Sequence, residues 1–272
     1  MKYQPVSNTI NYLILLSSLL AGYFALTDLQ ISISFINTKA AWAIFLEKYG
    51  EIPGLLVLLA GIHLYLSYSG SFRKIKNWII TIILFLATLF ISGYITFVVV
   101  QGSGGSIEFL MEYSVLIIAG LLVLNVALLL ILSKRKLTEN VIKFSKVTVL
   151  LGLYGYLFLV QPFKIFWGRI RFRDLDSLHA SFTSWFIPNG ITGSESFPSG
   201  HSAMGWMLLP LLILVNKSKI KKHILLVLIS LWALTVGISR VVIGAHFASD
   251  VLFGALFIII TYIFLTKYYL QE

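Results

Sequence analysis

Long apolar stretches separated by short polar segments dominate the chain. Eight of them approach the roughly 20 residues that an α-helix needs to cross a bilayer. The predicted spans are 9–27, 53–70, 78–101, 113–133, 147–163, 200–216, 224–240 and 246–266. No stretch alternates as the strands of a membrane barrel do. The pattern therefore predicts an all-α, polytopic helical bundle, with residues 1–272 forming a single integral membrane domain.

Two segments near the N-terminus need separate interpretation. The first apolar run follows Lys2 and is similar to a signal peptide, but no convincing small-residue cleavage site follows before Asp28. We expect a retained first helix, with cleavage as the alternative. Segment 32–50 places Trp42 and Phe45 among charged residues, so we expect it to lie in the membrane interface without crossing.

The composition agrees with a membrane protein. The chain is 58% hydrophobic and 12% charged, about half the charge of a typical soluble domain. Because it contains no cysteine, disulfides and thiolate metal sites are excluded. Its net charge of +10 would be compatible with nucleic-acid binding in a soluble protein, so the location of the charges decides its meaning.

The basic residues predict the orientation of the bundle. With eight spans, loops 71–77, 134–146 and 217–223 share one side with both termini, where fourteen Lys and Arg face two Glu, a net of +12. The opposite side has seven cations and nine carboxylates, a net of −2. The first side should be cytoplasmic. The +10 is then an orientation signal that favours anionic lipids, and we expect no nucleic-acid partner.

Five of the seven outer cations fall in three polar clusters on that outer side. Charged groups near membrane depth are costly and are functional-site hypotheses by default. The clusters are Lys164 with Arg169, Arg171 and Arg173, then Pro198-Ser199-Gly200-His201, then Ser239-Arg240 with His246 and Asp250.

Each cluster also has a simpler interpretation. Lys and Arg suit phosphate oxygens, but they also form ordinary basic collars at helix ends. Ser199 and Gly200 before a helix favour anion binding by free N–H groups, but they also fit an ordinary cap beside a surface histidine. His246 and Asp250 are four residues apart, which on a helix lets the carboxylate orient the imidazole. A structural His–Asp pair has the same spacing.

Together the three clusters resemble the signature of the type 2 phosphatidic acid phosphatase (PAP2) family, which is related to the vanadium haloperoxidases. The family pattern is K-x6-R-P, P-S-G-H and S-R-x5-H-x3-D, and the resemblance covers residues 147–266. One position departs from it, because Phe172 stands where the family usually has Pro. We expect the neighbouring Arg169 and Arg173 to compensate for the altered turn.

The resemblance implies a six-helix catalytic core and a role for each matching residue. His246 would attack phosphorus and form a phosphohistidine, with Asp250 orienting it. His201 would protonate the leaving oxygen and then activate water. Phosphate oxygens would be held by Lys164, Arg171, Ser199, Gly200 and Arg240. Because fixed cations can stabilise the transferred phosphoryl group, we expect no metal and no cofactor.

These observations predict an enzyme of the plasma membrane with its active site on the extracytoplasmic face. The expected substrate is a lipid phosphate monoester or diphosphate, with undecaprenyl diphosphate favoured by the outward site if the host is a bacterium. Phosphatidate or phosphatidylglycerophosphate is the alternative, because the motif residues suit a phosphate group and do not indicate which lipid tail carries it. Rivals of another class are a membrane transporter and a catalytically silent lipid-binding protein.

Several further polar residues are expected to have no role in the site. His63 should be packed or hydrogen-bonded inside its span, and His223 should be solvated. We expect a solvated outer loop for segment 172–197 as well, which contains Asp174, Asp176, His179 and Glu195, with a role in substrate entry as the alternative.

Overall fold

The computed structural model describes residues 5–69, 78–215 and 218–270. Helices make up 77% of the described residues and no strand occurs in these ranges, which confirms the predicted all-α class. Several residues used to predict the orientation, namely Lys2, Arg73, Lys74, Lys76, Lys217 and Glu272, lie outside the ranges.

Helices follow one another along the chain with short connections, apart from one long loop before α9. They are α1 (Pro5–Phe35), α2 (Ala41–Tyr49), α3 (Ile52–Ser69), α4 (Trp78–Gly102), α5 (Ile107–Glu112), α6 (Ser114–Ser133), α7 (Glu139–Leu150), α8 (Gln161–Trp167), α9 (Gly200–Trp206), α10 (Leu211–Leu214), α11 (Lys219–Val242) and α12 (Ala248–Leu270). A π-helical segment, Leu151–Val160, joins α7 to α8 without a break, and a 3₁₀ turn covers Phe172–Asp174.

Seven helical segments in these ranges are long and apolar enough to cross a membrane, which confirms a multi-pass helical bundle. The predicted span 200–216 differs, because the structure gives it only the shorter apolar stretch Gly200–Leu214, broken into α9 and α10. Pro210 lies in the turn between them. Because α9 packs against α3, α11 and α12, its interrupted backbone is covered by protein, where such breaks are tolerated.

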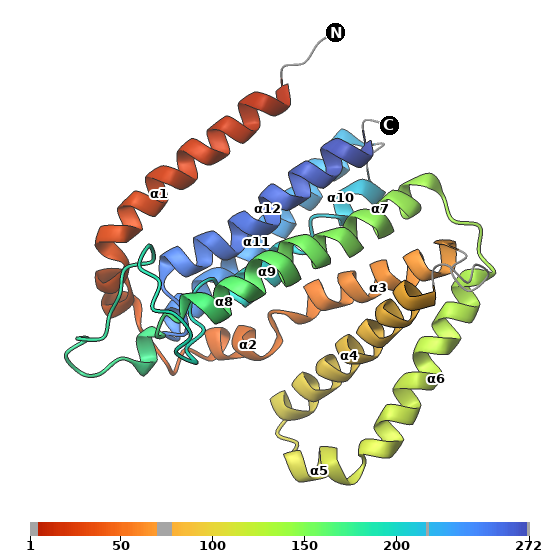
Figure 1. Cartoon of the computed structure of the whole chain (residues 1–272), viewed down its shortest axis with the longest axis horizontal. Helices are drawn as coiled ribbons and strands as arrows, with labels where there is room; N and C mark the ends of the chain where they lie inside the picture. Colours follow the sequence, from red (N-terminus) through yellow and green to blue (C-terminus); the bar gives the residue numbers. More distant parts are fainter. Residues whose placement is uncertain (1–4, 70–77, 216–217, 271–272) are drawn as a thin grey trace.

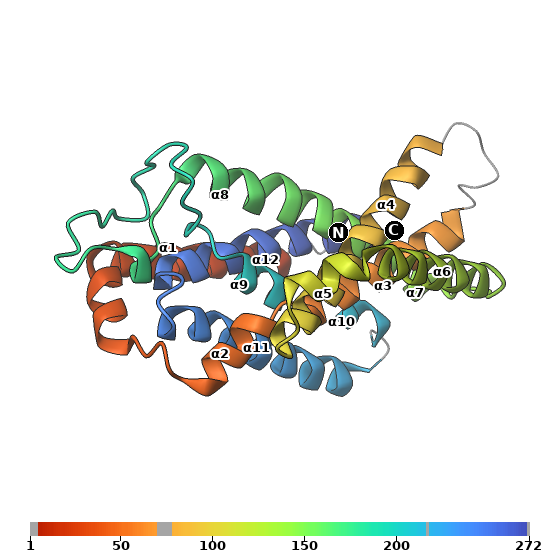
Figure 2. The same cartoon turned by 90° about the horizontal axis from the view of Figure 1, so that it is seen from below.

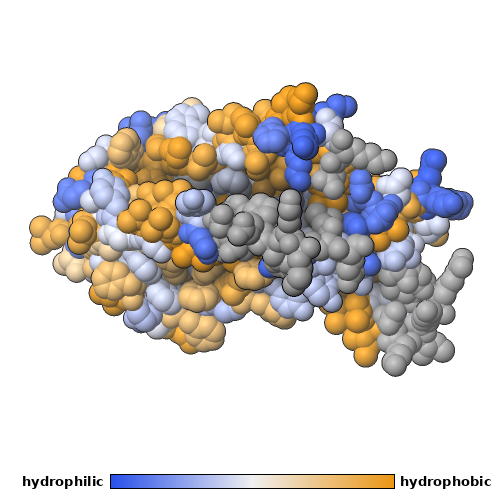
Figure 3. Space-filling view, turned by 90° about the horizontal axis from the view of Figure 1, so that it is seen from above, coloured by the Kyte–Doolittle hydropathy of each residue, from blue (hydrophilic) through white to orange (hydrophobic). Residues whose placement is uncertain are grey.

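The long helices surround α9. Helices α3, α11 and α12 pack against α9, and α7 packs against α3 and α12, while α1 lies along α12 on one flank (Figure 1). On the other flank α4, α5 and α6 form a hairpin against α3 (Figure 1). Apolar residues cover much of the face in Figure 3, and large exposed side chains of the bundle include Leu26, Phe90 and Val115. Such a surface suits contact with lipid tails.

The two ends of the bundle differ. The long connection 168–199 lies at one end together with α2, as both views show (Figure 1, Figure 2). The basic turn between α6 and α7 lies at the other end, with Lys134, Arg135 and Lys136 (Figure 1). The candidate site residues are therefore at the end away from this basic turn.

Segment 32–50 is more closely packed than the sequence suggested. Its first residues belong to α1, and the separate helix α2 buries Ala43 and Leu46 while it packs against α11. Trp42 and Phe45 remain exposed, as an interfacial position would require. The packing matters for the site, because it fixes the end of α2 beside α11.

A glycine lets α3 approach α9 closely. A Cβ atom on Gly54 would lie 2.2 Å from the carbonyl oxygen of Met204 in α9. Small residues at helix contacts allow backbones to approach in this way. The contact places the first turn of α3 next to Met204, in the second turn of α9.

We predict that Gly54→Ala destabilises the protein by about 1–3 kcal/mol, because the added methyl group forces α3 away from α9. The matched control is Gly120→Ala in α6, where an added Cβ meets nothing within 4 Å. Thermal unfolding in detergent should show a lower midpoint for Gly54→Ala only. Equal midpoints for the two variants would contradict the close contact.

Candidate active site

The structure brings the three polar clusters together through the segment just before α9. The Nζ of Lys164 donates to the carbonyl oxygen of Glu195 at 2.7 Å. The next residue, Ser196, contacts His246, and the backbone N–H of Ser199 donates to the carbonyl oxygen of Asp250 at 2.9 Å. Residues 195–199 therefore contact both the first and the third cluster.

His246 is held in one tautomer. It lies in the turn between α11 and α12, 3% exposed, with Nδ1 2.6 Å from the carbonyl oxygen of Ser196. A carbonyl oxygen only accepts, so Nδ1 carries the proton and Nε2 keeps its lone pair. Burial, and then the charges of Lys164, Arg240 and His201, hold the pKa of His246 well below its usual range. The neutral ring has the form that a nucleophile needs.

Asp250 does not orient His246 directly, so this expectation was wrong. Its Oδ2 lies 3.9 Å from Nδ1 of His246, too far for a hydrogen bond. The reason is that His246 precedes α12, so the two residues do not share a helical face. Oδ2 instead accepts from the backbone N–H of Phe247 at 2.8 Å, as in a capping box, and from the Ser196 hydroxyl at 2.6 Å. Asp250 thus fixes Ser196, and Ser196 orients His246.

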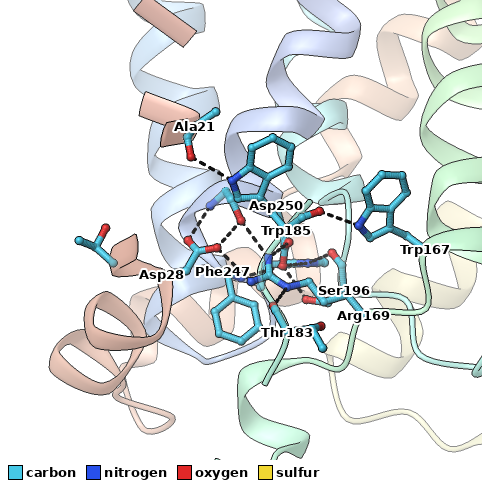
Figure 4. A network of polar contacts seen from close by, with 12 residues as sticks. Ala21, Asp28, Trp167, Arg169, Thr183, Trp185, Ser196, Phe247 and Asp250 are labelled. Carbon is cyan, nitrogen blue, oxygen red and sulfur yellow. Dashed lines mark hydrogen bonds and ion pairs between the residues drawn. The ribbon is translucent and has the colours of Figure 1, made fainter. Parts of the chain in front are cut away.

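Arg169 is the centre of a buried polar network (Figure 4). Its guanidinium pairs with Asp250 at 2.6 Å and with Asp28 of α1 at 3.0 Å, and it also donates to Ser249 and to the carbonyl oxygen of Thr183. Arg169 and Asp250 are both 0% exposed. All its acceptors are protein groups of this network, so its contacts give no support to the expected compensation for Phe172.

Arg171 and Arg240 are different. The Nε of Arg171 and the Nε and Nη1 of Arg240 are buried and have no hydrogen-bond partner among the described residues. Buried charged donors without acceptors are rare and need an explanation. Lys164 lies close enough to Arg171 for their charges to interact. These free N–H groups point to the binding of an oxyanion.

His201 is the first residue after Gly200 at the start of α9. Its Nδ1 lies 3.0 Å from Oε1 of Glu51, and its Nε2 lies 2.9 Å from the carbonyl oxygen of Glu47. The carboxylate of Glu47 also accepts from Arg240 at 3.3 Å and from Arg173 at 2.8 Å. Arg173 therefore balances a carboxylate, and its expected compensation for Phe172 has no support in these contacts.

The N-cap of α9 is formed as predicted. The Ser199 hydroxyl accepts from the backbone N–H of Ser202 at 3.3 Å. A Cβ on Gly200 would lie 3.5 Å from Cε of Lys164 and 3.7 Å from Oε1 of Glu51. Gly200 is therefore next to the cationic first cluster, although the Ser199 hydroxyl and N–H already have protein partners.

Sequence reasoning missed the acidic residues of the first helices and Ser196. Asp28 had an available signal, because a lone carboxylate within an apolar helix is a functional-site hypothesis. Glu47 and Glu51 are four residues apart, but Glu47 lies in α2 and Glu51 lies in the break between α2 and α3. No local pattern links them to His201 and Arg240. Ser196 acts mainly through its backbone carbonyl, which no side-chain motif can reveal.

Most of the polar residues expected to have no role lie away from the site. His63 is buried and bonded to the carbonyl oxygen of Leu59, and Asp176 accepts from N–H groups of its own exposed loop. Glu195 is the exception, because its carbonyl and its carboxylate, the latter at 3.9 Å, face Lys164. Phe172 is buried against Phe247, so the turn forms without the family proline.

In the part of the chain that the structure describes, no group of three or more His, Asp or Glu side chains could hold a metal ion. The metal-independent reaction stays a prediction.

Fold and site together define a polytopic helical membrane protein whose buried histidine is surrounded by cations at one end of the bundle. The family model of the PAP2 superfamily matches residues 145–272, which confirms the resemblance to this superfamily over that region. The match supports phosphoester hydrolysis as the general kind of activity. Comparisons with curated proteins and with solved structures gave no significant match.

We predict opposite effects for two neighbouring arginines. Arg169→Gln should destabilise the protein by about 3–5 kcal/mol, because it leaves Asp28 and Asp250 buried without their cation. Arg171→Gln should keep the stability but weaken the binding of inorganic phosphate. Thermal unfolding with and without phosphate measures both effects. Loss of stability in Arg171→Gln with a stable Arg169→Gln would contradict the assigned roles.

Proposed function

We propose that this protein is an integral membrane phosphatase that hydrolyses a phosphate monoester or diphosphate on a lipid through a phosphohistidine intermediate. One observation carries the proposal. A neutral histidine with a free Nε2 lies among cations whose buried N–H groups lack acceptors among the described residues. Phosphoryl transfer depends mainly on positioning and on stabilising charge at the equatorial oxygens, and this arrangement supplies both.

In the first step, Nε2 of His246 attacks phosphorus and the bond from phosphorus to the leaving oxygen breaks. The oxygens of the transferred group accept from Arg171, Arg240 and Lys164. The electron pair of the broken bond stays on the leaving oxygen, which takes a proton from His201. The products are the dephosphorylated lipid, or the lipid monophosphate when the substrate is a diphosphate, and phosphorylated His246.

In the second step, water attacks the phosphohistidine and transfers a proton to His201, which regenerates both histidines and releases inorganic phosphate. For His201 to reach the substrate, Nε2 must exchange the carbonyl oxygen of Glu47 for the leaving oxygen. The substrate must also share Arg240 with the carboxylate of Glu47. Glu47 therefore competes with the substrate twice. Its carbonyl oxygen competes for Nε2 of His201, and its carboxylate competes for Arg240.

A cavity of about 290 Å³ lies beside Glu47 and Glu51, and its lining supports the proposal of an amphiphilic substrate. Its polar wall includes Glu47, Glu51 and Tyr94, and its apolar wall includes Leu55 and Phe97. A lipid presents the same junction of polar head and apolar tail. We favour undecaprenyl diphosphate, with phosphatidate or phosphatidylglycerophosphate as the alternative substrates of the same site.

We predict that the purified protein releases phosphate from lipid phosphates in the presence of EDTA, because fixed cations take the place of a metal. The rates of phosphate release from undecaprenyl diphosphate, phosphatidate and phosphatidylglycerophosphate should show which of these lipids the enzyme prefers. Labelled phosphate should be trapped on the wild type and not on His246→Ala. Undiminished turnover by His246→Ala would exclude the proposed nucleophile, and activity lost in EDTA and restored by a metal would exclude the metal-independent reaction.

The extracytoplasmic position of the site gives another prediction. The chain has no cysteine, so single cysteines can be placed on a clean background. Ser181→Cys lies in the exposed site loop, and Ser133→Cys lies at the exposed end of α6. In intact cells an impermeant thiol reagent should label Cys at position 181 only. The reverse pattern would place the site in the cytoplasm and remove the argument for an outward-facing lipid carrier.

A further inference from the structure

A second carboxylate–histidine pair lies in the site, formed by Glu51 and His201. Both oxygens of Glu51 have partners: Oε1 lies 3.0 Å from Nδ1 of His201, and Oε2 accepts from the hydroxyl of Tyr94 at 3.2 Å. The side chain of Glu51 is 14% exposed and that of His201 is 20% exposed. Tyr94, Glu51 and His201 therefore form a continuous chain of hydrogen-bonding groups, which runs from the exposed Tyr94 to the largely buried Glu51 and His201.

The fold fixes this carboxylate by its backbone. Glu51 lies between α2 and α3, and its carbonyl oxygen accepts the first hydrogen bond of α3 from Leu55 at 3.0 Å. Gly54, one turn further on, allows the close contact between α3 and α9. His201 lies at the corresponding start of α9. The same contact that joins the two helices therefore places Glu51 opposite His201.

The chemistry of a general acid explains why a carboxylate is useful at this position. His201 must carry a proton on the nitrogen that faces the leaving oxygen, and it must accept one from water in the second step. A carboxylate on Nδ1 fixes the orientation of the ring and stabilises the imidazolium, as the aspartate does in a catalytic triad. Nδ1 and Nε2 both face acceptors in this structure, an arrangement that suits the doubly protonated ring.

We propose that Glu51 is the positioning residue of His201, and that Tyr94 in turn positions Glu51. The proposal rests on the proposed function, in which His201 is the general acid and base. Both positioning residues precede the region 145–272 that matches the family model. The first helices of the chain thus complete the acid–base half of a site whose nucleophile and phosphate-binding groups lie in the matched region.

The test compares two leaving groups. An alkyl lipid monophosphate needs protonation of its leaving oxygen, whereas p-nitrophenyl phosphate releases a stable anion that needs little. General acid catalysis commonly contributes about 10²–10⁴-fold, so Glu51→Ala should lower kcat on the lipid by at least about tenfold more than on the aryl phosphate, with KM changed less than about threefold. Glu51→Gln retains an acceptor for Nδ1–H and should recover part of the loss, and Tyr94→Phe should show a smaller loss with the same preference.

Controls separate positioning from folding. Glu112→Gln removes an exposed carboxylate of α5, outside the site, and should behave as the wild type. Inorganic phosphate should raise the unfolding midpoint of each Glu51 variant as it does for the wild type, because phosphate binding does not need the acid. If Glu51→Ala does not fold, the loss of kcat on the lipid relative to the aryl phosphate is measured in Glu51→Gln and Tyr94→Phe. These two variants then decide whether Glu51 positions His201.

The outcomes distinguish the two proposals. Equal loss on both substrates with phosphate binding intact, or no loss on either, would overturn the role of Glu51 and leave the phosphatase standing. A wild-type protein that releases no phosphate from either substrate would overturn the proposed function and with it the role of Glu51. A preferential loss on the lipid, with partial recovery in Glu51→Gln, supports the positioning role.

Discussion

The ion pairs of Arg169 with Asp28 and Asp250 are the interaction on which the rest of the site depends. They join the first helix, the loop after α8 and the start of α12 in a region closed to solvent. A buried charge that loses its partner is strongly destabilising, so these three segments are held in one arrangement. Asp250 can then fix Ser196, and the Ser196 carbonyl sets the tautomer of His246.

This arrangement separates the cations into two groups. The Nε, Nη1 and Nη2 atoms of Arg169 each have a protein acceptor, so Arg169 acts as a structural residue. Arg171 and Arg240 keep buried N–H groups without acceptors among the described residues. The same residue type therefore serves the fold at one position and suits an oxyanion two residues later. The difference lies in the acceptors that the tertiary structure brings to each guanidinium.

Glu47 of α2 and Glu51, between α2 and α3, extend the site beyond the region that matches the family. Glu47 balances Arg173 and Arg240, and Glu51 faces His201. Their position depends on the packing of α2 on α11 and on the close contact of α3 with α9. The N-terminal helices are thus part of the candidate active site as well as of the membrane-embedded bundle.

The sequence by itself determined the all-α membrane class and the candidate phosphate-site residues, because apolar runs and side-chain types at fixed spacing are local properties of the chain. It could not decide that span 200–216 is short and broken, because protein contacts around α9 replace the lipid that a full span would face. Only the tertiary structure decided the partners of Asp250, Arg169 and His201. Those partners come from distant helices and from a backbone carbonyl, and neither helical periodicity nor motif spacing specifies which groups meet across a packed bundle.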